Sequence, residues 1–240
     1  MKNTKKLVVS AILLAWILVL GMTQLGFIPF GPIRATTLHI PVIIGAILYG
    51  PYVGTFLGLS FGLYSLWTNY TKPTVLSFAF QNPLISVLPR IIFPLIAYFL
   101  YKALKEKSHK QMIRITSIIS SVLLIEIIYS LVKAFKDGKT LGIVIGLISL
   151  VLIVMIWIMT IKKENIITPG FVSAVIATIC HTAMVMGSIY LIYSDKMMGI
   201  KNMDRKGVLY YILSVVFLNG IPEAIIAGLI TGGILSRKQS

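Results

Sequence analysis

Apolar residues run through this chain in long stretches that short polar connections separate. A helix needs about 20 consecutive apolar residues to cross a bilayer, and several stretches approach that length. The pattern predicts an all-α polytopic membrane protein that forms one integral membrane domain, residues 1–240. Eight apolar segments are expected, at residues 7–25, 38–50, 52–68, 84–104, 115–134, 141–161, 169–193 and 208–235.

The fifth and sixth segments differ in composition from the other six. They are rich in Ile, Leu, Val and Ser, contain few glycines and lack proline. This contrast predicts a two-helix insertion at 115–161 within a six-helix core that comprises 7–105 and 169–235. An even number of crossings would return the C-terminus to the side of the N-terminus.

The charge of the chain is strongly positive, with 22 Lys and Arg against 7 Asp and Glu and a formal net charge of +15. Most of these cations lie in connections and tails, where they contact lipid headgroups and set topology. The densest cluster, Lys102–Arg114, indicates a cytoplasmic connection and hence cytoplasmic termini. The bilayer is therefore the expected partner, and nucleic acid is not, because no basic soluble domain is present.

Side chains that carry out catalysis are scarce in the apolar segments. Their only acids are Glu126 and Glu223, which form no paired-carboxylate motif, and no His spacing matches a metal site. The single cysteine, Cys180, excludes disulfides within the chain. A Walker motif is also absent. These features favour transport or binding over an enzyme, with no metal and no cofactor.

Three polar residues in the apolar segments are candidates for binding a substrate. Arg90 is expected about two turns inside the fourth segment, where a cation must face a cavity, a carboxylate or the interface. Glu223 follows a proline that should kink the eighth segment, and it can pair with Arg90 or bind a ligand. Asn219, one turn before Glu223, is the better ligand candidate of the two.

Further candidates lie close to the expected outer loops. Arg34 is a cation in a Pro- and Gly-rich loop, and His39 begins the second segment. Asn69 and Asn82 bracket the second outer loop, where an amide either caps a helix or contacts a ligand. His39 is at least as consistent with a structural histidine, and His181 is interpreted as a packed side chain.

Small residues recur at helical spacing in two segments. Gly54, Gly58 and Gly62 lie four apart, so they share one face and allow a second helix to approach closely. Ala11 and Ala15 form a similar small face on the first segment. Such alanine pairs are common in membrane helices.

Three stretches together resemble the S components of energy-coupling factor (ECF) vitamin transporters. They are GPIRATTLHIPVIIGAILYGPYVGTFLGLSFGL, NPLISVLPRIIFPLIAYFLYK and NGIPEAIIAGLI. The resemblance implies a six-helix bacterial membrane subunit that binds a vitamin at its outer side. It also implies two kinds of partner, a transmembrane coupling protein and a pair of ABC ATPases. Ala11 and Ala15 match the Ala-x-x-x-Ala face with which the family docks on the coupling protein.

The first stretch is most similar to the pantothenate-type branch, whose ligand carries one carboxylate that Arg90 or Arg34 can meet. Cobalamin-type members share much of this pattern, so another vitamin remains an alternative. An autonomous secondary transporter is a further alternative, although no inverted repeat is evident. The two extra helices depart from the family's six and are compatible with docking only if they lie away from the first segment.

Overall fold

Each of the eight apolar segments forms one helix or a short series of helices. The structure is a computed structural model that describes residues 2–23, 26–30, 33–136, 138, 140–162 and 168–239. The elements are α1 Lys2–Met22, β1 Phe27–Phe30, β2 Ile33–Thr36, α2 His39–Tyr49, α3 Pro51–Thr71, α4 Ser77–Phe80, α5 Pro83–Ser86, α6 Leu88–Lys105, α7 His109–Lys136, α8 Thr140–Lys162, α9 Thr168–Lys201, α10 Arg205–Val215, the π-helical turn η1 Val216–Gly220 and α11 Ile221–Gln239.

The helices confirm an all-α polytopic membrane protein. By length and composition, four spans of the described residues can cross a membrane: Thr4–Met22, Pro83–Lys105, His109–Lys136 and Pro169–Ile200. Shorter apolar helices complete the set at His39–Tyr49, Gly142–Met155 and Ile221–Ser236.

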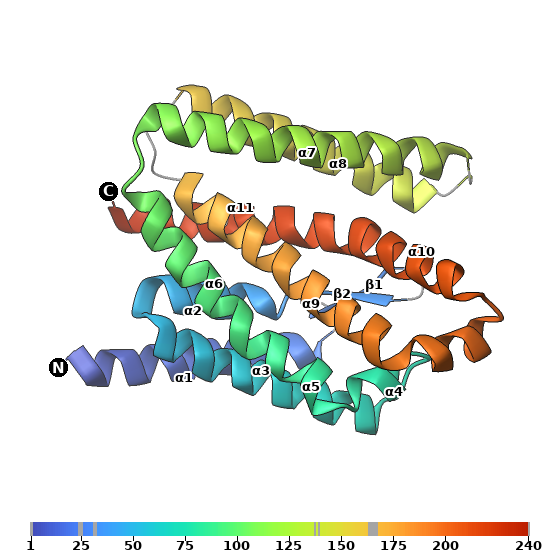
Figure 1. Cartoon of the computed structure of the whole chain (residues 1–240). Helices are drawn as coiled ribbons and strands as arrows, with labels where there is room; N and C mark the ends of the chain where they lie inside the picture. The colour runs from blue at the N-terminus through green and yellow to red at the C-terminus, as the bar shows by residue number, and fades with distance from the viewer. Residues whose placement is uncertain are drawn as a thin grey trace.

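Helix α1 and the pair α7–α8 lie at opposite edges of the molecule. Figure 1 shows α1 along one edge, α7 and α8 along the other, and α6, α9 and α11 between them. The pair α7–α8 packs mainly on itself and touches the rest of the molecule through α9 and α11. Helices α7 and α8 therefore leave the surface of α1 uncovered.

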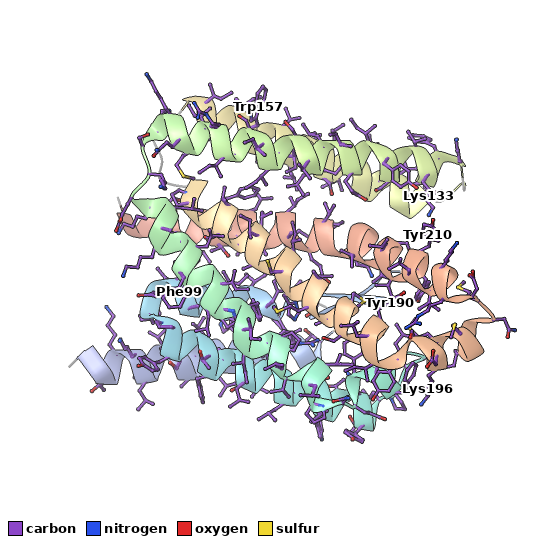
Figure 2. All side chains as sticks on the ribbon, in the orientation of Figure 1. Phe99, Lys133, Trp157, Tyr190, Lys196 and Tyr210 are labelled. Atoms are coloured by element: carbon purple, nitrogen blue, oxygen red, sulfur yellow. The ribbon has the colours of Figure 1, made fainter. Side chains whose placement is uncertain are left out.

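The helices run between two opposite ends of the bundle. Figure 1 places both termini at one end of the bundle. Figure 2 shows Lys133, Lys196 and Tyr210 at the opposite end. The helices thus run back and forth between two ends, as consecutive membrane crossings require.

A small antiparallel hairpin interrupts the helical pattern between α1 and α2. Strand β1 pairs with β2 in a register that places Phe27 opposite Thr36 and Phe30 opposite Ile33. Pro29 has no N–H to donate within a helix and destabilises a helix interior, which favours the extended conformation here. The hairpin connects directly to α2 and contacts η1, so it lies beside the buried centre of the bundle.

The three spaced glycines allow α3 to pack against α6 and the segment that precedes it. A Cβ at Gly58 would collide with the carbonyl oxygen of Arg90, and one at Gly62 would lie 2.9 Å from the carbonyl oxygen of Ser86. At Gly54 a Cβ would lie 2.5 Å from that of Ala46 on α2. The expectation of a close-packing glycine face is thus confirmed by the geometry, and this face fixes the backbone of Arg90.

Proline shapes the fourth and eighth segments in different ways. The fourth segment breaks at Val87, so α6 begins at Leu88 with Pro89 in its first turn. In the eighth segment a π-helical turn, η1, ends at Gly220, two residues before Pro222. Proline lacks the N–H of the normal helical hydrogen bond and crowds the preceding turn, which accounts for this widening.

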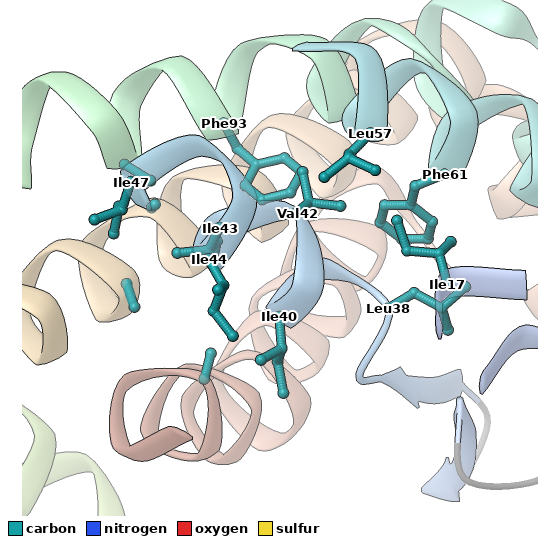
Figure 3. Packing of buried hydrophobic residues seen from close by; sticks show 14 of the residues in the cluster. Ile17, Leu38, Ile40, Val42, Ile43, Ile44, Ile47, Leu57, Phe61 and Phe93 are labelled. Atoms are coloured by element: carbon teal, nitrogen blue, oxygen red, sulfur yellow. The ribbon is translucent and has the colours of Figure 1, made fainter. Parts of the chain in front are cut away.

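The core between α1, α2, α3 and α6 consists of large apolar side chains. Helix α2 is buried along nearly all of its length. Figure 3 shows Phe61 of α3 and Phe93 of α6 in the cluster that surrounds the α2 side chains. Both rings are fully buried, and they also contact the polar residues of the candidate site.

Candidate substrate site

Arg90 is the buried cation around which the candidate site is built. It lies in the first turn of α6, one turn closer to the helix start than expected, because the segment breaks at Val87. The residue is only 5% exposed. One terminal nitrogen, Nη1, donates to the carbonyl oxygen of Ile85. Among the described residues its Nε has no hydrogen-bond partner, so part of the guanidinium's capacity is unused.

Two aromatic rings flank the guanidinium of Arg90. Its central carbon lies 5.5 Å from the ring centroid of Phe61 and 5.6 Å from that of Phe80. Cations within about 6 Å of an aromatic centroid are stabilised by the electron-rich face of the ring. These contacts hold the cation in the interior without neutralising it.

Glu223 joins the first turn of α11 to the hairpin. Its Oε1 accepts a hydrogen bond of 2.6 Å from the backbone N–H of Thr36. Glu223 also lies within electrostatic range of Arg90. Within the described part of the chain no ion pair joins them, so the two side chains are neighbours without a direct salt bridge.

Two histidines from distant parts of the chain meet beside Arg90. His39 opens α2 and His181 lies in α9, and their rings are stacked with centroids 6.5 Å apart. They are 1% and 4% exposed. His39 lies next to the backbone of Thr36 and Glu223 without reaching hydrogen-bond geometry. Within the described residues, no ring nitrogen of either histidine has a hydrogen-bond partner.

His181 is enclosed by aromatic rings on two further sides. The ring centroid of Phe93 lies 4.8 Å from that of His181, and the centroid of Phe61 lies at 6.2 Å. Phe61 therefore borders both the guanidinium of Arg90 and the imidazole of His181. From the sequence, His181 was interpreted as a packed side chain. Its place in the cluster depends on the packing of α9. The only sequence feature that could have indicated it is a polar residue within an apolar segment.

Asn219 lies in the π-helical turn, where it is 7% exposed. A Cβ at the neighbouring Gly220 would lie 3.2 Å from the Thr182 side chain, so η1 packs closely on α9 one residue after His181. π-Helical turns often occur at functional sites. Asn219 thus sits on the same stretch as Glu223, close to the hairpin, and its contact with a ligand stays a prediction.

Asn69 and Asn82 take part in local structure at the connection between α3 and α6. Asn69 donates to the carbonyl of Ser65 at 2.8 Å and accepts from the hydroxyl of Ser77 at 2.7 Å. Asn82 caps α5 by accepting from the N–H of Leu84 at 3.0 Å, and its amide donates to the hydroxyl of Tyr193 at 3.4 Å. These bonds support the capping alternative for Asn82 and give Asn69 a structural role within and beside α3, while a ligand contact remains a prediction for both.

The remaining predicted residues, Arg34, Ala11 and Ala15, are not placed in this cluster. The backbone of Arg34 pairs with Pro29 in the hairpin, and its side chain lies outside the described part of the structure. Ala11 and Ala15 are exposed on α1. They share that surface with Ile12 and Trp16, which are likewise exposed, so a smooth apolar face is available.

The residues gathered around Arg90 have the chemistry to bind an anion. Within the described residues, no group of three His, Cys, Asp or Glu side chains could hold a metal ion. Aromatic rings border the polar groups of the site, which are a buried guanidinium, one carboxylate and two imidazoles. Such a set can recognise a small molecule with a negative group and uncharged polar groups.

The family model of the ECF transporter substrate-specific component matches residues 5–135, which is more than half of the 240-residue chain. The chain belongs to this family. The matched range includes α1, the hairpin, Arg90 and helix α7, but not α8. Whether 115–161 is an insertion into the S-component core therefore stays a prediction.

Two curated proteins are similar to part of this S component. The pantothenate transporter PanT of Leuconostoc mesenteroides subsp. mesenteroides is 37% identical over 100 residues, 39% of this chain and 49% of that protein. The pantothenic acid transporter PanT of Lactococcus lactis subsp. cremoris is 40% identical over 88 residues, 31% of this chain and 44% of that protein. The chain thus spans about half the length of the curated relatives it matches.

Proposed function

We propose that this S component captures pantothenate and delivers it to the cell through a shared ECF coupling protein and two ABC ATPases. The observation that carries the proposal is the buried guanidinium of Arg90, whose Nε has no partner among the described residues. A ligand carboxylate would satisfy it through charge-assisted hydrogen bonds. The names of the two relatives support pantothenate as the ligand.

The proposed orientation places both termini in the cytoplasm and the hairpin half towards the outside. The end of α6, the start of α7 and the connection between them carry exposed lysines at the end of the molecule where the termini lie. Positive residues near helix ends favour the cytoplasmic side. The ligand would then reach Arg90 from the opposite end, past the hairpin and the connection from α3 to α6.

Docking on the coupling protein is proposed to use the exposed alanines of α1. Ala11 and Ala15 lie on an apolar surface that no other described element covers. Helices α7 and α8 occupy the far edge of the molecule and leave this surface accessible. The position of the two extra helices is therefore compatible with docking through α1.

Identification of the ligand tests the proposal directly. The protein is purified in detergent from cells grown in rich medium, and small molecules released on denaturation are identified by mass spectrometry. Pantothenate is expected at close to one per protein. Recovery of cobalamin instead would assign a different vitamin, and failure to bind any vitamin added back would contradict the binding role.

Isothermal titration calorimetry in nanodiscs tests the role of Arg90. Arg90→Gln is expected to weaken pantothenate binding by at least tenfold, because loss of a charged hydrogen-bond partner costs about 1.5–3 kcal/mol. Arg114→Gln, the same substitution at an exposed position of α7, is the matched control. Unchanged affinity in Arg90→Gln would remove the anion-binding role and leave the family assignment standing.

Reconstitution separates an S component from an autonomous carrier. Proteoliposomes that contain the protein alone should accumulate no labelled pantothenate. Those that also contain the coupling protein and the ATPases should accumulate it when ATP is supplied. Uptake without the ATPases would contradict the proposal.

A further inference from the structure

The imidazoles of His39 and His181 carry hydrogen-bonding capacity that the described protein atoms do not use. All four ring nitrogens are buried and none has a protein partner within the described residues. The rings are stacked on each other and border Phe61 and Phe93. Buried polar atoms are nearly always satisfied, so these nitrogens are available to a bound ligand as far as the described residues show.

We infer that the His39–His181 pair recognises the uncharged hydroxyl end of the ligand while Arg90 holds its carboxylate. This inference rests on the proposed function and names two specificity-determining residues of the same site. The chemical class it selects is a monocarboxylate that carries hydroxyl groups remote from its carboxylate. Pantothenate belongs to that class, since its hydroxyl groups lie at the end opposite its carboxylate.

The ring of Phe61 connects the two arms of the site. Its centroid is 5.5 Å from the central guanidinium carbon of Arg90 and 6.2 Å from that of the His181 ring. His181 in turn stacks on His39, so the three polar side chains form one cluster. The apolar rings of Phe61 and Phe93 would border the carbon skeleton between the ligand's polar ends.

The chemistry of imidazole suits a hydroxyl better than a second carboxylate. A neutral imidazole offers one donor and one acceptor, and a hydroxyl can both donate and accept. A carboxylate only accepts, so it would leave one nitrogen of each ring unsatisfied. The pair therefore discriminates against dicarboxylates and against ligands that lack hydroxyls.

A set of two analogues and two variants tests the inference by calorimetry in nanodiscs. The probes are pantothenate, its analogue with both hydroxyls replaced by hydrogen, and panthenol, in which a hydroxymethyl group replaces the carboxylate. His181→Phe should weaken pantothenate binding by about tenfold or more, the effect of one lost hydrogen bond to a site built for it, and leave the dehydroxylated analogue unaffected. Arg90→Gln should weaken pantothenate binding and leave panthenol unaffected.

Two comparisons guard against loss of folding as the explanation. Cys180→Ala, next to His181 on α9 and outside the cluster, should bind all three probes as the wild type does. In the absence of ligand, His181→Phe should unfold at the same temperature as the wild type or higher, because it removes buried polar atoms that lack protein partners. His181→Asn should recover part of the lost pantothenate affinity.

The outcomes distinguish this inference from the proposed function. If the wild type fails to bind pantothenate, the proposed function and the inference both fall. If the wild type binds pantothenate and His181→Phe keeps the same preference over the dehydroxylated analogue, only the inference is overturned. A marked fall in the unfolding temperature of ligand-free His181→Phe would also overturn it, since the imidazole would then serve the fold.

Discussion

The carboxylate of Glu223 accepts a 2.6 Å hydrogen bond from the backbone N–H of Thr36, which lies 187 residues earlier in the chain. This bond ties the end of the hairpin to the first turn of α11, beside the buried cation Arg90. The hairpin leads into α2 and α11 follows the π-helical turn, so the bond links these two parts of the bundle. A displacement of the hairpin at Thr36 would therefore break or strain its bond to Glu223.

Loss of the Glu223 carboxylate should destabilise the fold. Glu223→Ala leaves the Thr36 N–H buried without its acceptor, at a cost of about 1–3 kcal/mol. Glu223→Gln retains an oxygen acceptor and should recover most of that loss. Intrinsic-fluorescence unfolding in detergent gives the measurement, with Glu106→Ala at an exposed position as the control. Equal unfolding temperatures for Glu223→Ala and the wild type would show that the bond contributes nothing.

Gly58 should tolerate no side chain, because a Cβ there collides with the carbonyl oxygen of Arg90. Gly58→Ala forces α3 and α6 apart, and overpacking of this kind costs about 1–3 kcal/mol. We expect a lower unfolding temperature together with weaker pantothenate binding, since Arg90 moves with its backbone.

The matched control for Gly58→Ala is Gly187→Ala on α9, where a new Cβ meets no atom within 4 Å. Removal of a helical glycine without a clash should stabilise the protein by about 0.5–1 kcal/mol. The two substitutions should therefore shift the unfolding temperature in opposite directions. A shift in the same direction for both would mean that α3 and α6 have room to adjust.

Enlargement of the α1 surface should abolish transport and spare ligand binding. Ala11→Trp and Ala15→Trp place bulk on the exposed face that is proposed to meet the coupling protein. Val122→Trp, on the exposed surface of α7 at the opposite edge, is the control. Uptake into proteoliposomes with the full transporter, compared with calorimetric affinity, separates the two effects. Normal uptake in both Ala11→Trp and Ala15→Trp would place the docking surface elsewhere.

Asn69→Ala should act on stability rather than on recognition. The amide of Asn69 already bonds to Ser65 and Ser77, so its loss should cost about 0.5–1.5 kcal/mol per hydrogen bond. Pantothenate affinity should change by less than about threefold. A lost ligand hydrogen bond of about 1.5 kcal/mol would instead weaken binding by about tenfold. A tenfold loss of affinity at unchanged unfolding temperature would instead establish Asn69 as a ligand contact.

The helices could be predicted from the sequence because each contains a long apolar stretch. Such stretches can be read from the sequence without knowledge of the tertiary contacts. The hairpin could not, because residues 27–36 combine apolar side chains with prolines in a segment too short for a clear strand pattern. The break at Val87 was also missed, since the apolar run continues through it and only the backbone shows where α6 begins.

The candidate site was only partly predictable. Arg90, Glu223 and His39 are conspicuous because charged and polar side chains are costly inside a membrane. Their proximity to His181 depends on how α2, α6, α9 and α11 pack, which is a long-range property that local patterns do not record. The role of Phe61 as a wall shared by Arg90 and His181 likewise depends on the close approach of α3 to α6 that its glycines allow.

Both termini lie at the same end of the bundle, and the hairpin lies in the other half of the molecule. An affinity tag or fluorophore fused to either terminus would therefore project away from the hairpin and its neighbouring loops. Surface immobilisation through such a tag would present those loops to a flowing solution. The binding and uptake measurements can accordingly use one labelled protein without obstruction of the route to Arg90.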